Sequence, residues 1–294
     1  MAALSNPLAT PEQLASSGSR LDGIPSDLDD SIRFAAARLT QLAGVLLRLP
    51  QDIIAQAIVL FTRFWVGAEG GSLADCAAKD VSAAALYLAA KLSAYPRPPR
   101  SVLNVYAYLD AFPATLADAA QYSTKLDPTT YYLSEGDYHA LRSLLMRNEA
   151  RLLRTLGFQT HVALPHALCV SYLQALGAVP GGTAGQALAA RALAHLNAAL
   201  LSPQLLYLTH QPPALATAAI YLAAREVGVK LPADEWWEVF DTDREELGFL
   251  VVAFMSLPDF AREEKAKWGA GKVPLTLPEV EAELEKRRIL AREE

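Results

Sequence analysis

The histidines and cysteines are the first candidates for chemistry in this sequence, because few other side chains can ligate a metal or act as a general base near neutral pH. His161 and His166 stand five residues apart on either side of a proline, with no cysteine or carboxylate at ligand spacing. Cys76 and Cys169 are far apart and lie in apolar, helix-like stretches, which predicts buried free thiols rather than a disulfide or a zinc site. We therefore expect no metal site.

The sequence also contains no motif of a phosphate-binding loop and none of a catalytic nucleophile. The glycine pairs at 70–71 and 181–182 lack the strand pattern and the lysine of a phosphate-binding loop. No serine or cysteine stands in a known nucleophile motif. We predict no catalytic residue and no cofactor, so that the chain alone is not an enzyme. An all-α enzyme with an unrecognised site stays as an alternative, which turnover by the isolated chain would reveal.

Two charged side chains stand out because they interrupt apolar helical patterns. Lys91 ends a segment, residues 84–91, that is otherwise apolar on every side. Glu149 lies between a stripe of leucines that includes Leu145 and a second apolar margin that includes Leu153. An acid in that setting can mark a contact surface. A lysine reaching out to water and an ordinary glutamate at a helix edge would give the same pattern, and the residues alone leave both interpretations open.

Composition and charge define the class of protein. The 294 residues are 52% hydrophobic and 20% charged, which is typical of a folded globular chain. The net charge of −6 disfavours direct nucleic-acid binding, since the one dense basic cluster, residues 286–288, is set among glutamates. The first residues lack the pattern of a signal peptide, and no apolar run has the length of a membrane span. We expect neither nucleic acid nor a membrane as a direct partner.

Apolar periodicity predicts an all-α fold. After residues 1–26, which we expect to form an extended tail, apolar residues recur at helical spacing almost continuously. Part of the proline-containing stretch 94–133 must be loop. The expected helices cover residues 27–47, 50–65, 75–93, 99–112, 134–157, 165–177, 183–201, 212–227, 233–240 and 243–256.

A short internal repeat predicts two similar helical bundles. Residues 84–91 read AALYLAAK, and residues 218–225, placed 134 positions later, read AAIYLAAR. Because each segment is apolar on every side, each is expected to be the buried central helix of its bundle. The predicted organisation is an N-terminal tail, a first bundle, a second bundle and a charged helical extension, at residues 1–26, 27–160, 161–258 and 259–294.

Several segments occur in a recognisable order and spacing. They are GVLLRLPQ at 44–51, VLFTRF at 59–64, YLAAK at 87–91, residues 148–158, residues 161–166, YLQ at 172–174 and AIYLAAR at 219–225. Over about residues 25–258 this set resembles the cyclin superfamily, and within it the L type associated with transcription. The resemblance implies two tandem cyclin boxes, each a five-helix bundle, with a short C-terminal helix.

The resemblance also implies a function. Cyclins bind and activate a cyclin-dependent Ser/Thr kinase as its non-catalytic partner in a heterodimer, using a lysine and a glutamate as polar anchors. Lys91 and Glu149 occupy those positions here. The positions where the family places apolar contacts to the kinase are Leu88, Leu92, Leu153 and Phe158. Many cyclins have two acids where this chain has Ser93 and Ala94, which leaves the contact made by that loop undefined.

Finer expectations follow from the L-type resemblance. They are a PITSLRE-type kinase partner, roles in transcription and pre-mRNA splicing, a nuclear location, and a third, stabilising protein as a further candidate partner. Besides the all-α enzyme, two alternative hypotheses remain. One is another transcriptional cyclin, of the T, K, C or H type. The other is a transcription-factor core whose tandem cyclin-like boxes hold DNA.

Overall fold

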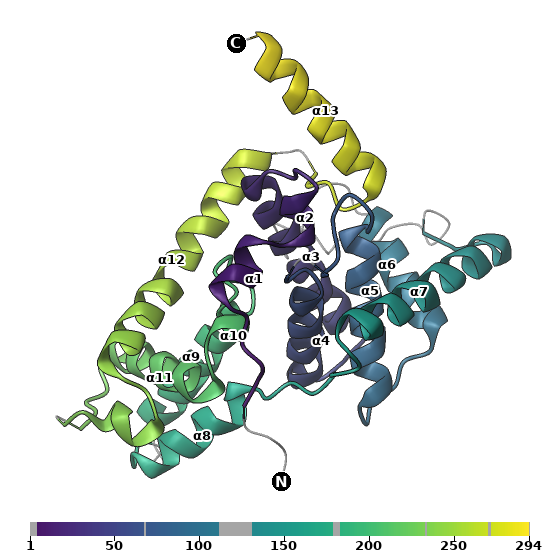
Figure 1. Cartoon of the computed structure of the whole chain (residues 1–294). Coiled ribbons are helices and arrows are strands. Elements are labelled where there is room, and N and C mark those ends of the chain that lie inside the picture. The colour runs from purple at the N-terminus through teal and green to yellow at the C-terminus, as the bar shows by residue number, and fades with distance from the viewer. Residues whose placement is uncertain are drawn as a thin grey trace. The chain divides into compact units, whose positions relative to one another are not determined.

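The computed structural model describes residues 5–67, 69–111, 131–178, 183–232, 234–269 and 272–293, and the regular structure within these ranges is helical. This confirms the expected all-α class. The helices form two compact units (Figure 1). The first unit is built from Thr10–Thr160 and Glu264–Glu294, and the second from Met1–Ala9 and His161–Glu263.

Helix bounds follow the apolar periodicity closely. The first unit contains α1 (Pro11–Ala15), α2 (Gly18–Leu21), α3 (Ser26–Leu46), α4 (Gln51–Phe64), α5 (Ala78–Leu92), α6 (Pro99–Ala111), α7 (Glu135–Thr155) and α13 (Leu277–Glu293). The second unit contains α8 (Pro165–Ala175), α9 (Thr183–Ala199), α10 (Leu206–Thr209), α11 (Pro212–Val227), the 3-10 helix η3 (Trp236–Phe240) and most of α12 (Arg244–Trp268). Much of the expected loop, at 112–130, and the glycine pair at 181–182 lie outside the described residues.

Three features differ from the expected helices. The tail is not simply extended, because it contains α1 and α2, and α10 was not expected at all. Helices of four or five residues are too short to show a helical period, which is why the pattern missed them. The helix expected to end near residue 256 continues through Pro258 to Trp268. A proline removes a single backbone donor, and a long helix can tolerate that loss.

The two repeated segments form the central helices of their units. In each one, six positions are buried, the tyrosine (Tyr87 or Tyr221) is half-buried, and the last residue (Lys91 or Arg225) is exposed. In the first unit α5 packs against α3, α4, α6 and α7, and in the second α11 packs against α8 and α9. A helix enclosed on several sides must be apolar all round, which explains both sequences.

The first residues of the chain are bound to the second unit. Asn6 is buried, and its side-chain amide makes two hydrogen bonds with the backbone of Ala163: Nδ2 donates to the carbonyl and Oδ1 accepts from the N–H, both at 2.8 Å. The side chain of Gln211 pairs in turn with the backbone N–H and C=O of Asn6, at 3.0 Å each. The Ala9 N–H donates to the Leu208 carbonyl at 2.8 Å. These bonds hold the segment in place.

Replacing Asn6 by alanine should destabilise the chain. The change removes both side-chain bonds and leaves the backbone N–H and C=O of Ala163 without these partners. We expect the free energy of unfolding, measured by urea denaturation, to fall by about 1–3 kcal/mol. Asn104→Ala, at an exposed position of α6, is the matched control and should change it by less than about 0.5 kcal/mol. Equal effects of the two substitutions would contradict this role of Asn6.

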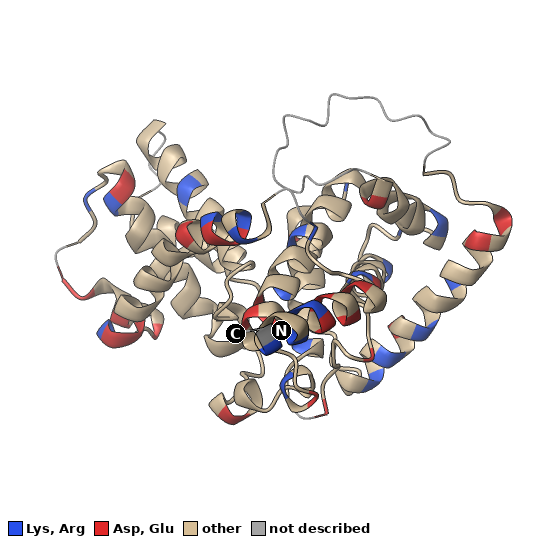
Figure 2. Ribbon diagram, turned by 90° about the horizontal axis from the view of Figure 1, so that it is seen from above, with Lys and Arg blue, Asp and Glu red and all other residues tan. Residues whose placement is uncertain are grey.

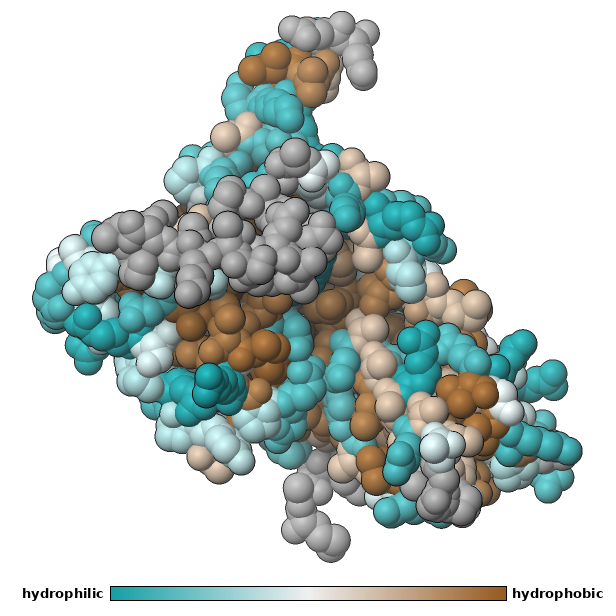
Figure 3. Space-filling model, turned by 180° about the vertical axis from the view of Figure 1, so that it is seen from behind, coloured by the Kyte–Doolittle hydropathy of each residue, from teal (hydrophilic) through white to brown (hydrophobic). Residues whose placement is uncertain are grey.

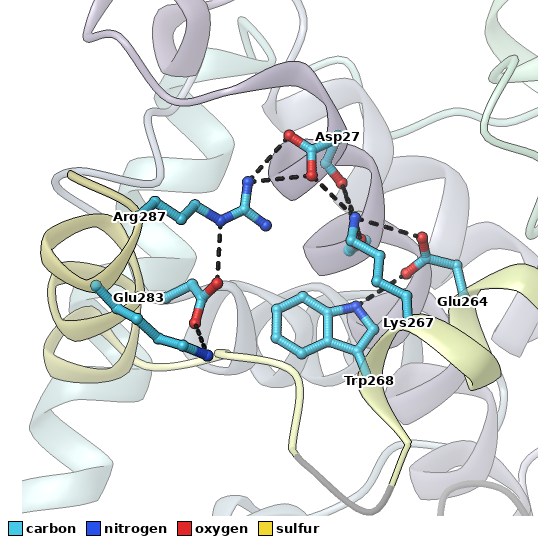
Figure 4. Close-up of polar contacts among 8 residues, drawn as sticks. Asp27, Glu264, Lys267, Trp268, Glu283 and Arg287 are labelled. Carbon is cyan, nitrogen blue, oxygen red and sulfur yellow. Dashed lines mark hydrogen bonds and ion pairs between the residues drawn. The ribbon is translucent and has the colours of Figure 1, made fainter. Parts of the chain in front are cut away.

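The C-terminal segment is bound to the first unit by an ionic network (Figure 4). The carboxylate of Asp27, in the first turn of α3, accepts hydrogen bonds from Lys267 of α12 and Arg287 of α13, at 3.0 Å each. Lys267 also donates to the Ser31 hydroxyl at 2.9 Å, and Glu283 accepts from Arg287 at 3.0 Å. Burial alone would raise the pKa of Asp27, but hydrogen bonds from the two cations lower it. One carboxylate therefore joins three helices.

Asp27→Asn should loosen α13, because the neutral amide cannot pair with two cations. We expect faster backbone hydrogen exchange over residues 277–293 at pH 7, whereas Asp52→Asn, in the first turn of α4, should change nothing. The pH dependence has a defined sign. A carboxylate whose pKa is lowered on folding stabilises the fold above its unfolded value of 3.8 and loses that effect as the pH falls below it.

Acidification through pH 3.8 should therefore loosen α13 more in the unmodified chain than in Asp27→Asn, after correction for intrinsic exchange rates. A remaining acid effect is expected in both, because partial burial would raise the pKa of Glu279 but its hydrogen bonds at the start of α13 lower it. Exchange over α13 that is insensitive to both the substitution and acid would contradict the role given to Asp27.

Both cysteines are free and buried, as predicted. Burial raises the pKa of the Cys76 thiol to about 11 and that of Cys169 to about 12, so neither is ionised near neutral pH. Among the described residues, the His, Cys, Asp and Glu side chains form no group of three or more that could hold a metal ion. None of the described helices is long and apolar enough to cross a membrane.

Candidate functional site

Lys91 and Glu149 meet on the first unit. Lys91 is the penultimate residue of α5, and Glu149 lies in α7, which packs against α5. The Nζ of Lys91 donates a hydrogen bond to Oε1 of Glu149 at 3.0 Å. The two charged residues that the sequence singles out, 58 positions apart, are therefore one ion pair.

The two members of this pair differ in exposure: the side chain of Lys91 is 53% exposed and that of Glu149 only 8%. Glu149 is therefore not an ordinary glutamate at a helix edge. Burying a carboxylate is costly unless a donor compensates for the lost water, and Lys91 is that donor. The hydrogen bond to Glu149 raises the pKa of Lys91, so the ammonium is charged at neutral pH.

Tyr87 adds a contact that sequence reasoning missed. Its ring lies beneath the Lys91 ammonium, with Nζ 5.6 Å from the ring centroid. A cation at this distance is attracted by the electrons of the aromatic face. The spacing is the signal that could have revealed the contact, because residues four apart on a helix are neighbours.

The end of α5 is shaped by Ser93. Its backbone N–H and its hydroxyl both donate to the Ala90 carbonyl, at 3.2 and 2.8 Å, and the hydroxyl oxygen accepts from the Tyr95 N–H at 3.0 Å. Such local bonding competes with further helix formation and stops α5 after Leu92. Lys91 therefore lies in the last turn, where the carbonyl end of a helix favours a cation.

The four predicted apolar contacts lie near the C-terminal ends of α5 and α7, the two helices that carry the pair, and apolar areas reach the molecular surface (Figure 3). Leu92 is 60% exposed and Phe158 is 70% exposed, while Leu153 is half-buried. Leu88, by contrast, is only 2% exposed. The structure therefore places three of the four predicted apolar contacts where a partner can reach them. Leu88 lies one turn before Leu92 and faces the core, so it supports the surface from below.

Phe158 is held in an uncommon backbone conformation. It follows Gly157 at the end of α7, and both residues have positive φ, at 55° and 61°. The Phe158 N–H donates to the Leu153 carbonyl at 2.8 Å and closes the helix. A left-handed phenylalanine costs about 1 kcal/mol, and exposing its ring to water does not offset that cost. Backbone strain that displays an apolar ring is typical of a binding surface.

Several known proteins are similar to this chain in sequence. No family model matches the chain. Human cyclin-L2 is 32% identical over 286 residues, which cover 97% of this chain and 49% of the relative. Cyclin-L1 of Gallus gallus is 30% identical over 291 residues, covering 99% and 48%. The chain thus spans about half the length of the curated relatives it matches.

Two solved structures match the fold. A chain of the yeast RNA Pol II CTD kinase CTDK-1 complex gives a TM-score of 0.67 at 12% identity, over 98% of this chain and 85% of that one. A chain of the Chaetomium thermophilum CAK complex bound to ATP-gamma-S gives 0.52 at 15% identity, over 87% and 72%. At these identities the likeness is one of fold alone. In sequence, the chain is similar to L-type cyclins over nearly all of its own length.

The direct pairing of Lys91 with Glu149 predicts coupled effects on stability. Lys91→Glu places a second carboxylate beside a nearly buried one, and Glu149→Lys places two ammonium groups together. Each should lower the free energy of unfolding by about 1–2 kcal/mol, less than for a fully buried pair because Lys91 is half exposed. The double exchange restores opposite charges and should recover at least half of the summed loss in urea denaturation. Strictly additive effects would show that the two charges do not interact.

Proposed function

We propose that this chain is the non-catalytic regulatory subunit of a cyclin-dependent Ser/Thr kinase of the PITSLRE type, acting in the nucleus in transcription and pre-mRNA splicing. The observation that supports this most is the Lys91–Glu149 pair, which joins α5 and α7, two helices at or just after whose C-terminal ends lie the exposed apolar side chains of Leu92 and Phe158. Polar anchors within an apolar surround are typical of the centre of a protein–protein interface.

Lys91 would be the principal donor to the kinase. An ammonium group has three N–H donors, and Glu149 uses one of them. The half-exposed position leaves the others free to bind backbone carbonyls of the kinase's mobile regulatory helix. Because Glu149 and the ring of Tyr87 already hold the ammonium in place, little side-chain entropy would be lost on binding. Leu92, Leu153 and Phe158 would bury apolar area around this contact.

The effect on the kinase would be a shift in population rather than chemistry by this chain. Binding would hold the regulatory helix inward, so that its glutamate pairs with the lysine that positions ATP, and would help to order the activation loop. The kinase would then spend more of its time in the competent state, in proportion to the difference in affinity between its two states.

The charge distribution gives no support to the DNA-holding alternative. The basic cluster at 286–288 is internally paired: Arg287 binds Asp27, and Lys286 and Arg288 each lie near a glutamate one turn away. Phosphates would have to displace these carboxylates. The hypothesis of another transcriptional cyclin type differs from the proposed function only in the kinase that is bound. The identity of the bound kinase therefore separates these two hypotheses.

Partner capture tests the proposal. The chain would be immobilised and exposed to nuclear extract of its own organism, and bound kinases identified by mass spectrometry. The captured kinase, produced with the chain, would then be assayed for phosphate transfer to a peptide. We expect one cyclin-dependent kinase to bind and to be activated. The Lys91→Glu/Glu149→Lys variant should lose about 30-fold or more in affinity, because its reversed charges face the kinase.

A second charge exchange is the matched control. Asp259→Arg/Arg262→Asp reverses an exposed pair on α12 and should retain full binding and activation. Kinase activation by the Lys91/Glu149 variant would exclude this surface as the interface. Capture of general transcription factors or DNA without any kinase would contradict the proposed function itself.

A further inference from the structure

Three arginines form a line along α7. Arg147, Arg151 and Arg154 stand four and three residues apart, and at 3.6 residues per turn they fall within about 60° of one another. Arg147 and Arg154 are exposed, whereas Leu145 and Leu152 of the same helix are buried. Figure 2 shows basic residues following one another along α7. We refer to the three side chains as the arginine ridge.

The ridge has little carboxylate to pair with in the part of the chain that the structure describes. Arg147 and Arg154 form no ion pair there. Arg151 forms only a long ion pair with Asp75, at 3.8 Å, and the side chains of Arg151 and Asp75 are 42% and 68% exposed. Glu149, the one acid of α7 after its first turn, is buried and bound by Lys91. Exposed arginines elsewhere are paired more closely, among them Arg100, Arg191 and Arg262.

Helix stability does not explain the ridge. Cations in the last turn of a helix stabilise its carbonyl end, which accounts for Arg154 and in part for Arg151. Arg147 lies two turns before the end of α7, beyond the range of that effect. A row of three positive charges with a single long ion pair, on a chain of net charge −6, points instead to an anionic ligand.

The geometry favours a phosphorylated peptide. Guanidinium groups bind phosphate in a bidentate manner, more specifically than lysine does. The ridge spans seven residues of helix, about 10 Å, which is room for two phosphate groups. Residues three apart in an extended peptide are also separated by about 10 Å. Nucleic-acid binding usually engages six or more phosphates over a wide basic surface, which this acidic chain lacks.

We propose that the arginine ridge is a second binding site, which takes a peptide segment carrying phosphate groups on residues three apart. The site is separate from the proposed kinase contact, because Glu149 faces the protein interior and the ridge faces water. Its test therefore needs no kinase. Failure of the ridge to bind would leave the Lys91–Glu149 surface unaffected, and the reverse also holds.

The test is fluorescence anisotropy on the full chain. The probe is a fluorescein-labelled twelve-residue peptide with two phosphoserines three residues apart, compared with its unphosphorylated form and with a twelve-nucleotide uridine RNA. We expect the diphosphorylated peptide to bind at least tenfold more tightly than either, with an affinity that falls as salt is added. Arg147→Gln/Arg154→Gln should weaken its binding about tenfold or more.

Two further variants separate ridge geometry from net charge. Arg262→Gln/Arg288→Gln removes the same charge at exposed positions of α12 and α13 and should bind like the unmodified chain. Arg147→Lys/Arg154→Lys keeps the charge but loses the planar donor pair, and should bind more weakly than the unmodified chain. No binding of the diphosphorylated peptide, an equal loss in the α12/α13 control, or tighter binding of the RNA would each overturn the proposal.

Discussion

The nearly buried carboxylate of Glu149 is the constraint on which the candidate site depends. A carboxylate in that position needs a donor, and the last turn of α5 has to end where it does for Lys91 to supply one. Ser93 ends the helix there, Tyr87 lies under the ammonium, and the chain leaves α7 at Gly157 with the ring of Phe158 exposed. The hydrogen bond between Lys91 and Glu149, at 3.0 Å, thus holds the C-terminal parts of α5 and α7 together.

The terminal segments impose a second constraint, since each belongs to the unit that is distant in sequence. The segment around Asn6 is bound to the second unit through the backbone of Ala163, and α13 and the end of α12 are bound to the first unit through Asp27. Neither unit is therefore complete as a continuous stretch of chain. A fragment cut between residues 160 and 161 would separate Asn6 from Ala163 and Asp27 from Arg287.

Local sequence pattern was enough to predict the long helices, whereas the short helices α1, α2 and α10 and the long-range contacts could not be predicted from it. The 3.6-residue period located the long helices, and the repeated segments identified α5 and α11 as central, because both signals lie within one helix. The contact between Lys91 and Glu149 joins residues 58 apart, and that between Asn6 and Ala163 joins residues 157 apart. Leu88 and Leu92 look alike in sequence, but their exposures of 2% and 60% are decided by where α5 ends.

The central claim is that the partner kinase binds over the Lys91–Glu149 pair. A photoreactive benzoylphenylalanine in place of Leu92, on the exposed rim of the pair, tests it most directly, with the same residue in place of exposed Val252 of α12 as control. The account predicts that light joins position 92 to the regulatory helix of the bound kinase and leaves position 252 unlinked. Cross-links from position 252 and none from position 92 would contradict it.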